Sequence, residues 1–205
     1  HNPDTWDRAG GNLRSVDEVL AQALRYRSYW GEKGGITVSG GEALLQIRSL
    51  TELFRKAKAL GINTCLDTSA QPFSRETTNF SAFEELMNYT DLILLDIKHI
   101  DSNAHKQLTG WKNENILDCA RYLSDIKKPV WIRHVLVPGI NDDDDSLHKL
   151  RKFLDSLGNI ERVEVLPYHD LGVYKWEQLG LPYALSEVKP PTEENILHAR
   201  KILTE

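Results

Sequence analysis

The polar residues of this sequence collect at the ends of predicted strands. Five apolar runs each finish in a polar cluster, at 39–42, 67–69, 96–98, 133–134 and 169–170. In parallel α/β folds the carboxyl ends of the strands share one edge of the sheet, and ligands bind at that edge. We therefore expect the five clusters to converge on one binding or catalytic site.

The sharpest of these clusters is Gly40-Gly41-Glu42, between a predicted strand and a predicted helix. Glycine costs backbone entropy, so two in succession indicate that something approaches the backbone closely. Tight packing of the strand against the helix is one explanation, and a backbone surface for a bound ligand is the other. The carboxylate of Glu42 favours a ligand that carries a positive amine.

The other charged residues also have plainer explanations. Asp67 could cap the loop after it, and Asp96 and Lys98, which share one face of a strand, could form a structural ion pair. His169 could be a buried imidazole with satisfied hydrogen bonds. We expect the acidic run 142–145 to supply the N-cap and favourable dipole charge of the next helix, rather than a metal site.

Strands and helices alternate along the chain and position these clusters. Near-continuous apolar runs predict parallel strands buried on both faces, at 36–39, 62–69, 91–98, 129–138 and 160–169. The first helix begins at the capping box 15–18, and further helices are predicted at 43–60, 81–89, 113–126, 145–157 and 192–203. Strand–helix alternation with short connections predicts one α/β domain over 1–205, either a barrel or an open parallel sheet.

Two segments stand outside this alternation. The helix that starts at Ser15 has no strand before it, and the chain opens at His1 without a methionine. We therefore expect a βα unit upstream of His1 in a longer protein. The segment 170–191 is long and aromatic, so it is predicted to contact or cover a substrate.

Composition and charge exclude several classes of protein. Of the 205 residues, 40% are hydrophobic and 27% charged, which is typical of soluble globular chains. The net charge of −5, without a basic stripe, argues against a nucleic-acid partner. No apolar run reaches the roughly 18 residues that a membrane span needs, and no signal-peptide pattern is present. Cys65 and Cys119 lie in apolar segments, so we expect reduced core thiols and a cytoplasmic protein.

Five segments together carry a family resemblance. TVSGGEALLQ at 37–46 resembles the GGE motif of the radical S-adenosylmethionine (SAM) superfamily. Together with four later segments in the same order, it makes the chain similar to the activases of glycyl radical enzymes, of the type that acts on pyruvate formate-lyase. The further segments that carry this similarity are CLDTSA at 65–70, LLDIKH at 94–99, VWIRHVLVPGINDDDD at 130–145 and LPYHDLGVYKW at 166–176.

The resemblance implies a fold, an activity and partners. The fold is a partial (β/α)6 barrel of the TIM type, here without its N-terminal βα part. SAM, bound to one iron of a [4Fe–4S] cluster, would be cleaved reductively to a 5′-deoxyadenosyl radical, which takes hydrogen from a glycine Cα of the partner enzyme. Flavodoxin or ferredoxin would supply the electron. We expect a monomer with no nucleic-acid or membrane partner.

The same resemblance assigns a cofactor site. Gly41 would contact SAM through its backbone, and Glu42 would shape the turn or balance the ammonium. Asp67 would add negative charge near that ammonium, Lys98 suits the methionyl carboxylate, and His169 would approach the adenosine. The full implied set is His1, Gly40, Gly41, Glu42, Asp67, Asp96, Ile97, Lys98 and His169.

The chain departs from the family at the cluster. The family holds its cluster with CxxxCxxC, and this sequence has no such motif. In the family the third cysteine directly precedes a His-Asn pair like His1-Asn2, so we expect the cysteines upstream of His1 and an inactive chain without them. No cysteine-rich insert is present, which favours the formate-lyase type. Two carboxylates, Asp67 and Asp96, would also tolerate a monovalent cation.

Three alternatives remain open from the sequence. The barrel could be a non-catalytic module that binds SAM or a protein. It could activate a different glycyl radical enzyme. It could also be a radical SAM enzyme that acts on a small molecule.

Overall fold

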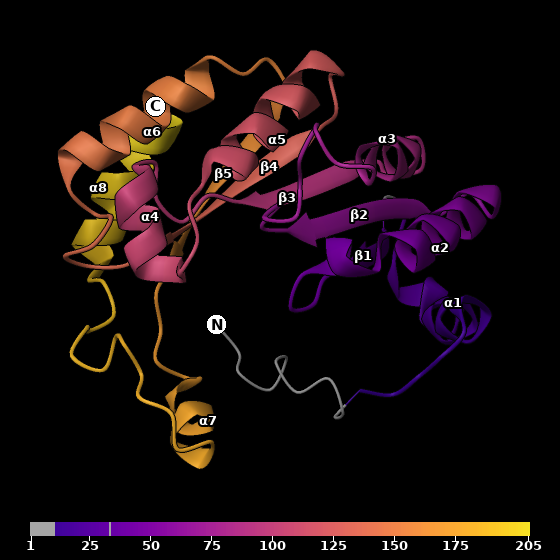
Figure 1. Ribbon diagram of the computed structural model, residues 1–205, viewed down its shortest axis with the longest axis horizontal. Coiled ribbons are helices and arrows are strands. Elements are labelled where there is room, and N and C mark those ends of the chain that lie inside the picture. The colour runs from indigo at the N-terminus through magenta and orange to yellow at the C-terminus, as the bar shows by residue number, and fades with distance from the viewer. Residues whose placement is uncertain (1–10, 33) are drawn as a thin grey trace.

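Five parallel strands form a curved sheet in the order in which they occur along the chain (Figure 1). This computed structural model describes residues 11–32 and 34–205. Each strand pairs with the one before it, so each connection is a crossover that returns the chain to the same edge. The five predicted strands are confirmed: β1 Gly35–Val38, β2 Asn63–Thr68, β3 Leu92–Asp96, β4 Val130–Leu136 and β5 Ile160–Pro167.

Helices follow the strands as the alternation predicts. The predicted ones are α1 Val16–Leu24, α2 Ile47–Ala59, α3 Phe80–Met87, α5 Glu114–Asp125, α6 Asp144–Asp155 and α8 Glu193–Thr204. The start of the predicted 43–60 helix is a separate 3-10 turn, η3 Ala43–Gln46. The helix predicted from Ser15 up to Gly34-Gly35 ends at Leu24, and a short 3-10 turn, η2 Arg27–Tyr29, follows it. Two short helices were not predicted: α4 Ser102–Thr109 and α7 Val173–Gln178. In the part of the chain that the structure describes, no helix could span a membrane.

The helices cover one face of the sheet, so the expectation of strands buried on both faces is wrong. Burial alternates strictly along β2, β3 and β4. The face toward the helices is buried, with Leu66, Ile93 and Ile132 at 0% exposure. The other face is half-buried, and we call it the open face; it carries Cys65, Asp67, Leu94, Asp96, Trp131 and Arg133. Its own apolar residues made the runs look continuous in sequence.

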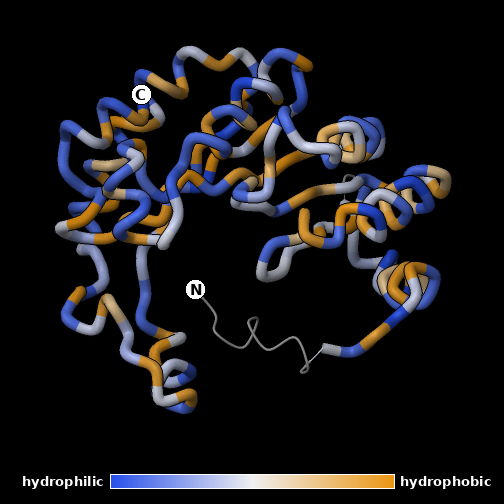
Figure 2. Tube along the Cα trace, viewed as in Figure 1, coloured by the Kyte–Doolittle hydropathy of each residue, from blue (hydrophilic) through white to orange (hydrophobic). Residues whose placement is uncertain are grey.

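The core lies between the sheet and its helices. Figure 2 shows hydrophobic colour along the strands and on the inward sides of the surrounding helices. Beyond the strands, α2 contributes Phe54 and α5 contributes Leu123, both at 0% exposure. This single core fixes the strands and therefore the edge where their carboxyl ends meet.

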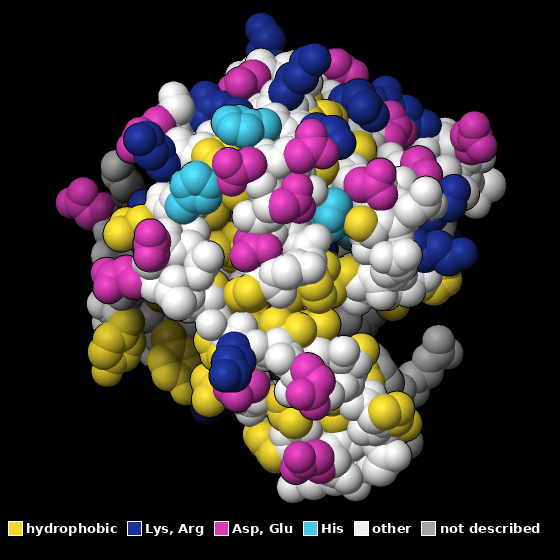
Figure 3. Space-filling model, turned by 90° about the vertical axis from the view of Figure 1, so that its left-hand side faces the viewer, with side chains coloured by type: hydrophobic (Ala, Val, Ile, Leu, Met, Phe, Trp, Pro, Cys, Tyr) yellow, Lys and Arg dark blue, Asp and Glu magenta, His cyan; other side chains and the backbone are white. Residues whose placement is uncertain are grey.

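The segment 170–191 stands away from the sheet and contains α7 (Figure 1). Within it the rings of Trp176 and Tyr183 are 5.5 Å apart, and the Tyr183 hydroxyl lies 3.0 Å from that of Tyr168, just after β5. Leu171 and Tyr174 are exposed. Figure 3 shows the side of the molecule that lies at the left in Figure 1. Charged and histidine side chains cover its upper part, and hydrophobic ones gather lower down.

The acidic run before α6 has the capping role that was predicted. The Asp143 side chain caps the helix by accepting from the Ser146 amide at 2.9 Å. Asp142 accepts from the amide of Gly139, whose positive φ of 74° suits glycine. Asp144 and Asp145 lie in the first turn, where negative charge stabilises the helix dipole.

Removing the cap is expected to destabilise the fold. Asp143→Ala should lower the free energy of unfolding by about 1 kcal/mol, because an orphan amide loses its acceptor. Asp145→Ala, which removes an exposed ion pair with Lys149 and a first-turn charge, should cost less than Asp143→Ala. Urea denaturation measures both; equal losses would contradict the assignment of the cap to Asp143.

Candidate active site

Four charged side chains of alternating sign are linked by successive ion pairs on the open face. Arg133 Nη1 donates to Asp67 Oδ2 at 2.6 Å, and Arg133 Nε lies 3.7 Å from Asp96 Oδ1. Lys98 Nζ donates to the other oxygen, Asp96 Oδ2, at 2.8 Å. We call Asp67, Arg133, Asp96 and Lys98 the charged row.

The sheet itself produces the charged row. Asp96 and Arg133 are register partners on β3 and β4, so their side chains leave the sheet on the same face. Asp67 pairs with Leu94, two residues before Asp96, and so joins the same face from β2. Asp67, Asp96 and Lys98, which were predicted to share one site, therefore lie on the same face of the sheet.

The charged row is electrically balanced but not fully hydrogen-bonded. Its side chains are only 17–24% exposed, so unpaired charges would be costly there. Burial lowers the pKa of Arg133, but the carboxylates of Asp96 and Asp67 outweigh it, so the net pKa is raised and the guanidinium stays charged. Asp96 Oδ1 is buried and accepts no hydrogen bond from any described residue. It is a free acceptor at the centre of the site.

Arg133 is the member of the row that the sequence reasoning missed. It was placed in a polar cluster at a strand end, but it was not assigned to the site. The signal that could have found it is the parallel register, which pairs Arg133 with Asp96. Ile97, by contrast, was assigned to the site, but its side chain is fully buried in the core and its amide donates to the Arg133 carbonyl. Because the Ile97 side chain points into the core, the side chains of Asp96 and Lys98 on either side of it lie on the open face.

Glu42 ties the glycine loop to the end of β2. Its Oε1 accepts from the Leu44 amide and the Thr68 hydroxyl. Its Oε2 accepts from the amide and the hydroxyl of Ser69, at 3.0 and 2.6 Å. Four donors fill the roughly four lone-pair positions of a carboxylate. Of the two roles expected for Glu42, its contacts favour shaping the turn over balancing an amine.

The hydrogen bonds of Glu42 hold a residue with a strained backbone, Ala70, in place. Ala70 follows the two residues that Glu42 binds, and its φ of 54° is unusual for a residue with a side chain. Such a conformation costs roughly 1–2 kcal/mol and persists where surrounding contacts enforce it. The Ala70 amide also donates to the Thr68 hydroxyl at 2.9 Å.

The loop that Glu42 fixes leaves open space at Gly40. A Cβ placed there would meet no described atom within 4 Å. Tight packing therefore does not explain Gly40, whereas a backbone surface for a ligand remains consistent with it.

Two histidines were predicted to belong to the site. His169 follows β5 and is exposed, so the alternative of a buried imidazole is wrong. His1 lies outside the described residues.

The two thiols differ in their surroundings. Cys119 is a core residue, as expected, and burial raises the pKa of its thiol. Cys65 is half-buried on the open face, and burial likewise raises its pKa. Neither forms a disulfide, and the described residues contain no group of three potential metal ligands.

Comparisons with known proteins agree with this geometry. Residues 1–150 match the model of the Radical SAM superfamily. The chain is 52% identical to a pyruvate formate-lyase-activating enzyme of Streptococcus mutans, over 99% of this chain and 78% of that protein. It is also 52% identical to one of Staphylococcus epidermidis, over 97% and 80% of the two chains.

Solved structures show the same fold. A domain of a pyruvate-formate lyase-activating enzyme from Bacteroides vulgatus matches with a TM-score of 0.68 and 28% identity, covering 83% of this chain and 93% of that one. SuiB of Streptococcus suis, solved with S-adenosylmethionine, matches with a TM-score of 0.70 at 18% identity, over 97% of this chain and 42% of that one. At that identity the likeness extends to the fold alone.

Removing Arg133 from the charged row is expected to leave Asp67 without a cation, while Asp96 keeps its ion pair with Lys98. Arg133→Met should lower the free energy of unfolding by about 1–3 kcal/mol, less than for a fully buried pair because the row is partly exposed. Arg162→Met removes an exposed arginine of β5 that pairs with Glu164, and should cost less than about 1 kcal/mol. Urea denaturation compares the two, and equal losses would contradict the bridging role of Arg133.

Acid is expected to destabilise the protein through two buried histidines. Burial lowers the pKa of His105 and of His134, so both stay neutral in the folded chain. Unfolded imidazoles take up protons near pH ~6.5, so as the pH falls below that value the unfolded state binds more protons and gains stability. The slope should reach about 1.4 kcal/mol per pH unit for each histidine.

A denaturation series between pH 8 and pH 5 measures this slope. His134→Asn should flatten it, because one of the two groups no longer titrates. An unfolding free energy that does not fall between pH 6.5 and 5, or a slope unchanged in His134→Asn, would show that these imidazoles are not held neutral.

Proposed function

The chain belongs to the radical SAM superfamily, and from this we propose that it activates a glycyl radical enzyme, pyruvate formate-lyase. The observation that carries the proposal is the 52% identity, over nearly the whole chain, to proteins named for that activity. The charged row supports it, because it lies at the strand ends where α/β folds bind ligands.

The residues present fit SAM. The family uses SAM and a [4Fe–4S] cluster. SAM carries a carboxylate and an ammonium on its methionyl part. The ammonium of Lys98 suits the carboxylate, and the free Asp96 Oδ1 is an acceptor for the ammonium or a hydroxyl. The open space at Gly40 allows approach to the backbone.

The role of these residues is to bind and orient. The chemistry that SAM and the cluster supply is abstraction of a hydrogen from a glycine Cα by a carbon radical. Lys98 and Asp96 would hold the methionyl part, Asp67 would add negative charge near it, and His169 would approach the adenosine. The two cysteines of this sequence do not fit the three-cysteine ligand set, so no residue here is assigned to the cluster.

Several finer features belong to the same proposal. A flavodoxin or ferredoxin supplies the electron, and the protein works as a cytoplasmic monomer. A monovalent cation lies near Asp67 and Asp96. It would share this region with the Arg133 guanidinium, which already lies beside both carboxylates.

The partner is proposed to dock near the segment 170–191. That segment exposes Leu171, Tyr174 and Leu179, at 74%, 52% and 53%. Exposed aromatic and aliphatic side chains of this kind are suited to protein contacts. Hydrogen exchange should slow in 170–191 when a peptide with the partner's glycine loop is added, and no change there would place the contact elsewhere.

The activity is tested with the full-length, cluster-reconstituted protein under reducing, anaerobic conditions. With SAM and pyruvate formate-lyase it should yield 5′-deoxyadenosine and a glycyl radical detectable by electron paramagnetic resonance. No 5′-deoxyadenosine would exclude the activase and leave a binding module. 5′-Deoxyadenosine without a glycyl radical would point to another substrate.

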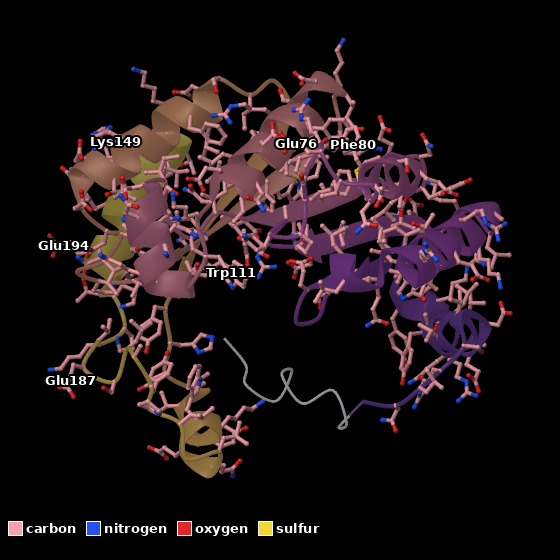
Figure 4. All side chains as sticks on the ribbon, in the orientation of Figure 1. Glu76, Phe80, Trp111, Lys149, Glu187 and Glu194 are labelled. Carbon is pink, nitrogen blue, oxygen red and sulfur yellow. The ribbon has the colours of Figure 1, made fainter. Side chains whose placement is uncertain are left out.

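Lys98→Met is expected to raise the KM for SAM by about 10- to 100-fold, because a charged hydrogen bond contributes about 1.5–3 kcal/mol. Lys149→Met is the control, since Lys149 points outward from α6 (Figure 4) and pairs with Asp145. Its KM should stay within about twofold of wild type. Equal effects of the two would remove Lys98 from the site.

A further inference from the structure

Resting on the proposed function, we infer that three buried side chains, Asn141, His134 and Asn113, are positioning residues that hold the SAM-binding segment 96–98 in place. They bind the backbone of 97–100, where the chain leaves the sheet. We call these three residues the clamp. None of them belongs to the cofactor-binding set that the resemblance implies, although His134 lies in the polar cluster 133–134.

The segment needs such support because its ladder of hydrogen bonds ends. The last sheet bond on the β4 side runs from the Ile97 amide to the Arg133 carbonyl. From Ile97 onward the chain is no longer strand, yet Lys98 must still project onto the open face. Buried carbonyls without donors are costly, so the next four require partners from elsewhere.

The clamp supplies a donor to each of the next four carbonyls. His134 Nδ1 lies 2.8 Å from the Ile97 carbonyl, and that ring nitrogen must carry the proton because a carbonyl only accepts. Asn141 Nδ2 donates to the Lys98 carbonyl at 2.7 Å. Asn113 Nδ2 donates to the carbonyls of residues 99 and 100, at 2.9 and 2.8 Å.

Asn141 connects the segment to the end of β4. Its second amide hydrogen goes to the Val135 carbonyl at 2.8 Å, and its Oδ1 accepts from the Val137 amide at 2.7 Å. One side chain thus fixes the backbone of Lys98 relative to Val135 in β4 and to Val137 just after it. The strand that carries Arg133 and the segment that carries Lys98 are held in one arrangement.

The low exposure and the hydrogen bonds of these side chains show that they serve the segment 97–100. His134, Asn141 and Asn113 are 2%, 1% and 1% exposed. Asn113 occupies the N-cap position of α5, where asparagine ordinarily caps its own helix. Its side chain makes no capping bond and instead binds the carbonyls of 99 and 100.

The consequence concerns how Lys98 meets its ligand. A binding group is effective when the side chain and its backbone are already in position, and small displacements are costly. Loss of the clamp should therefore weaken SAM binding, although no clamp atom is proposed to touch SAM.

The test is the dissociation constant of SAM, measured by calorimetry on the full-length, cluster-reconstituted protein. Asn141→Asp keeps the shape but sets an oxygen against two carbonyls, and is expected to weaken binding by about 10- to 100-fold. Asn159→Asp is the matched control. Asn159 is also buried and donates to a backbone carbonyl, that of Lys128, but at the opposite end of the same strands.

A second pair of variants separates an effect on the position of the segment 96–98 from an effect on folding. His134→Asn keeps an N–H donor beside Cγ and should restore SAM affinity to within about fivefold of wild type, whereas His134→Leu removes the donor and should not. Affinity within twofold of wild type in both Asn141→Asp and His134→Leu would overturn the inference. So would an equal loss in Asn159→Asp. If the wild-type protein itself fails to bind SAM, the proposed function falls instead.

Discussion

The guanidinium of Arg133 between two carboxylates is the interaction on which the open face depends. Asp67 and Asp96 come from neighbouring strands, and both are largely removed from water. Without a cation between them, the carboxyl ends of β2 and β3 would carry uncompensated charge where the sheet has no helices to cover it. The pairing makes it possible for a ligand site to exist there before a ligand arrives.

Around that interaction the structure separates its tasks by layer. Helices and the buried face of the sheet provide stability, while the open face carries the charges. Two sets of buried or half-buried hydrogen bonds then fix the strand ends, with Glu42 holding the glycine loop to β2 and Asn141 holding the Lys98 segment to β4. The backbone around the site is therefore held rigid by hydrogen bonds from side chains such as Glu42 and Asn141.

The sequence contained the fold almost completely, but the site only in part. The five strands and six of the helices follow from periodicity and capping residues such as Ser15. Burial on one face could not be foreseen, because Leu94 and Val135 are apolar yet lie on the open face. The partners of Glu42 and Asn141 lie 26 and 43 residues away, so no local pattern reveals them. Arg133 needed the register as well, because it lies within β4, which continues to Leu136, and only the register shows that it faces Asp96.

The sequential strand order has a consequence for how the chain matures during synthesis. Each strand pairs with the one made just before it, so every βα unit can dock as it leaves the ribosome. The charged row, however, is not completed one unit at a time. Asp67 and Asp96 are synthesised well before Arg133, and until β4 arrives only Lys98 balances one of these two carboxylates. Completion of β4 is thus the step at which an acidic intermediate becomes a neutral, ligand-ready surface.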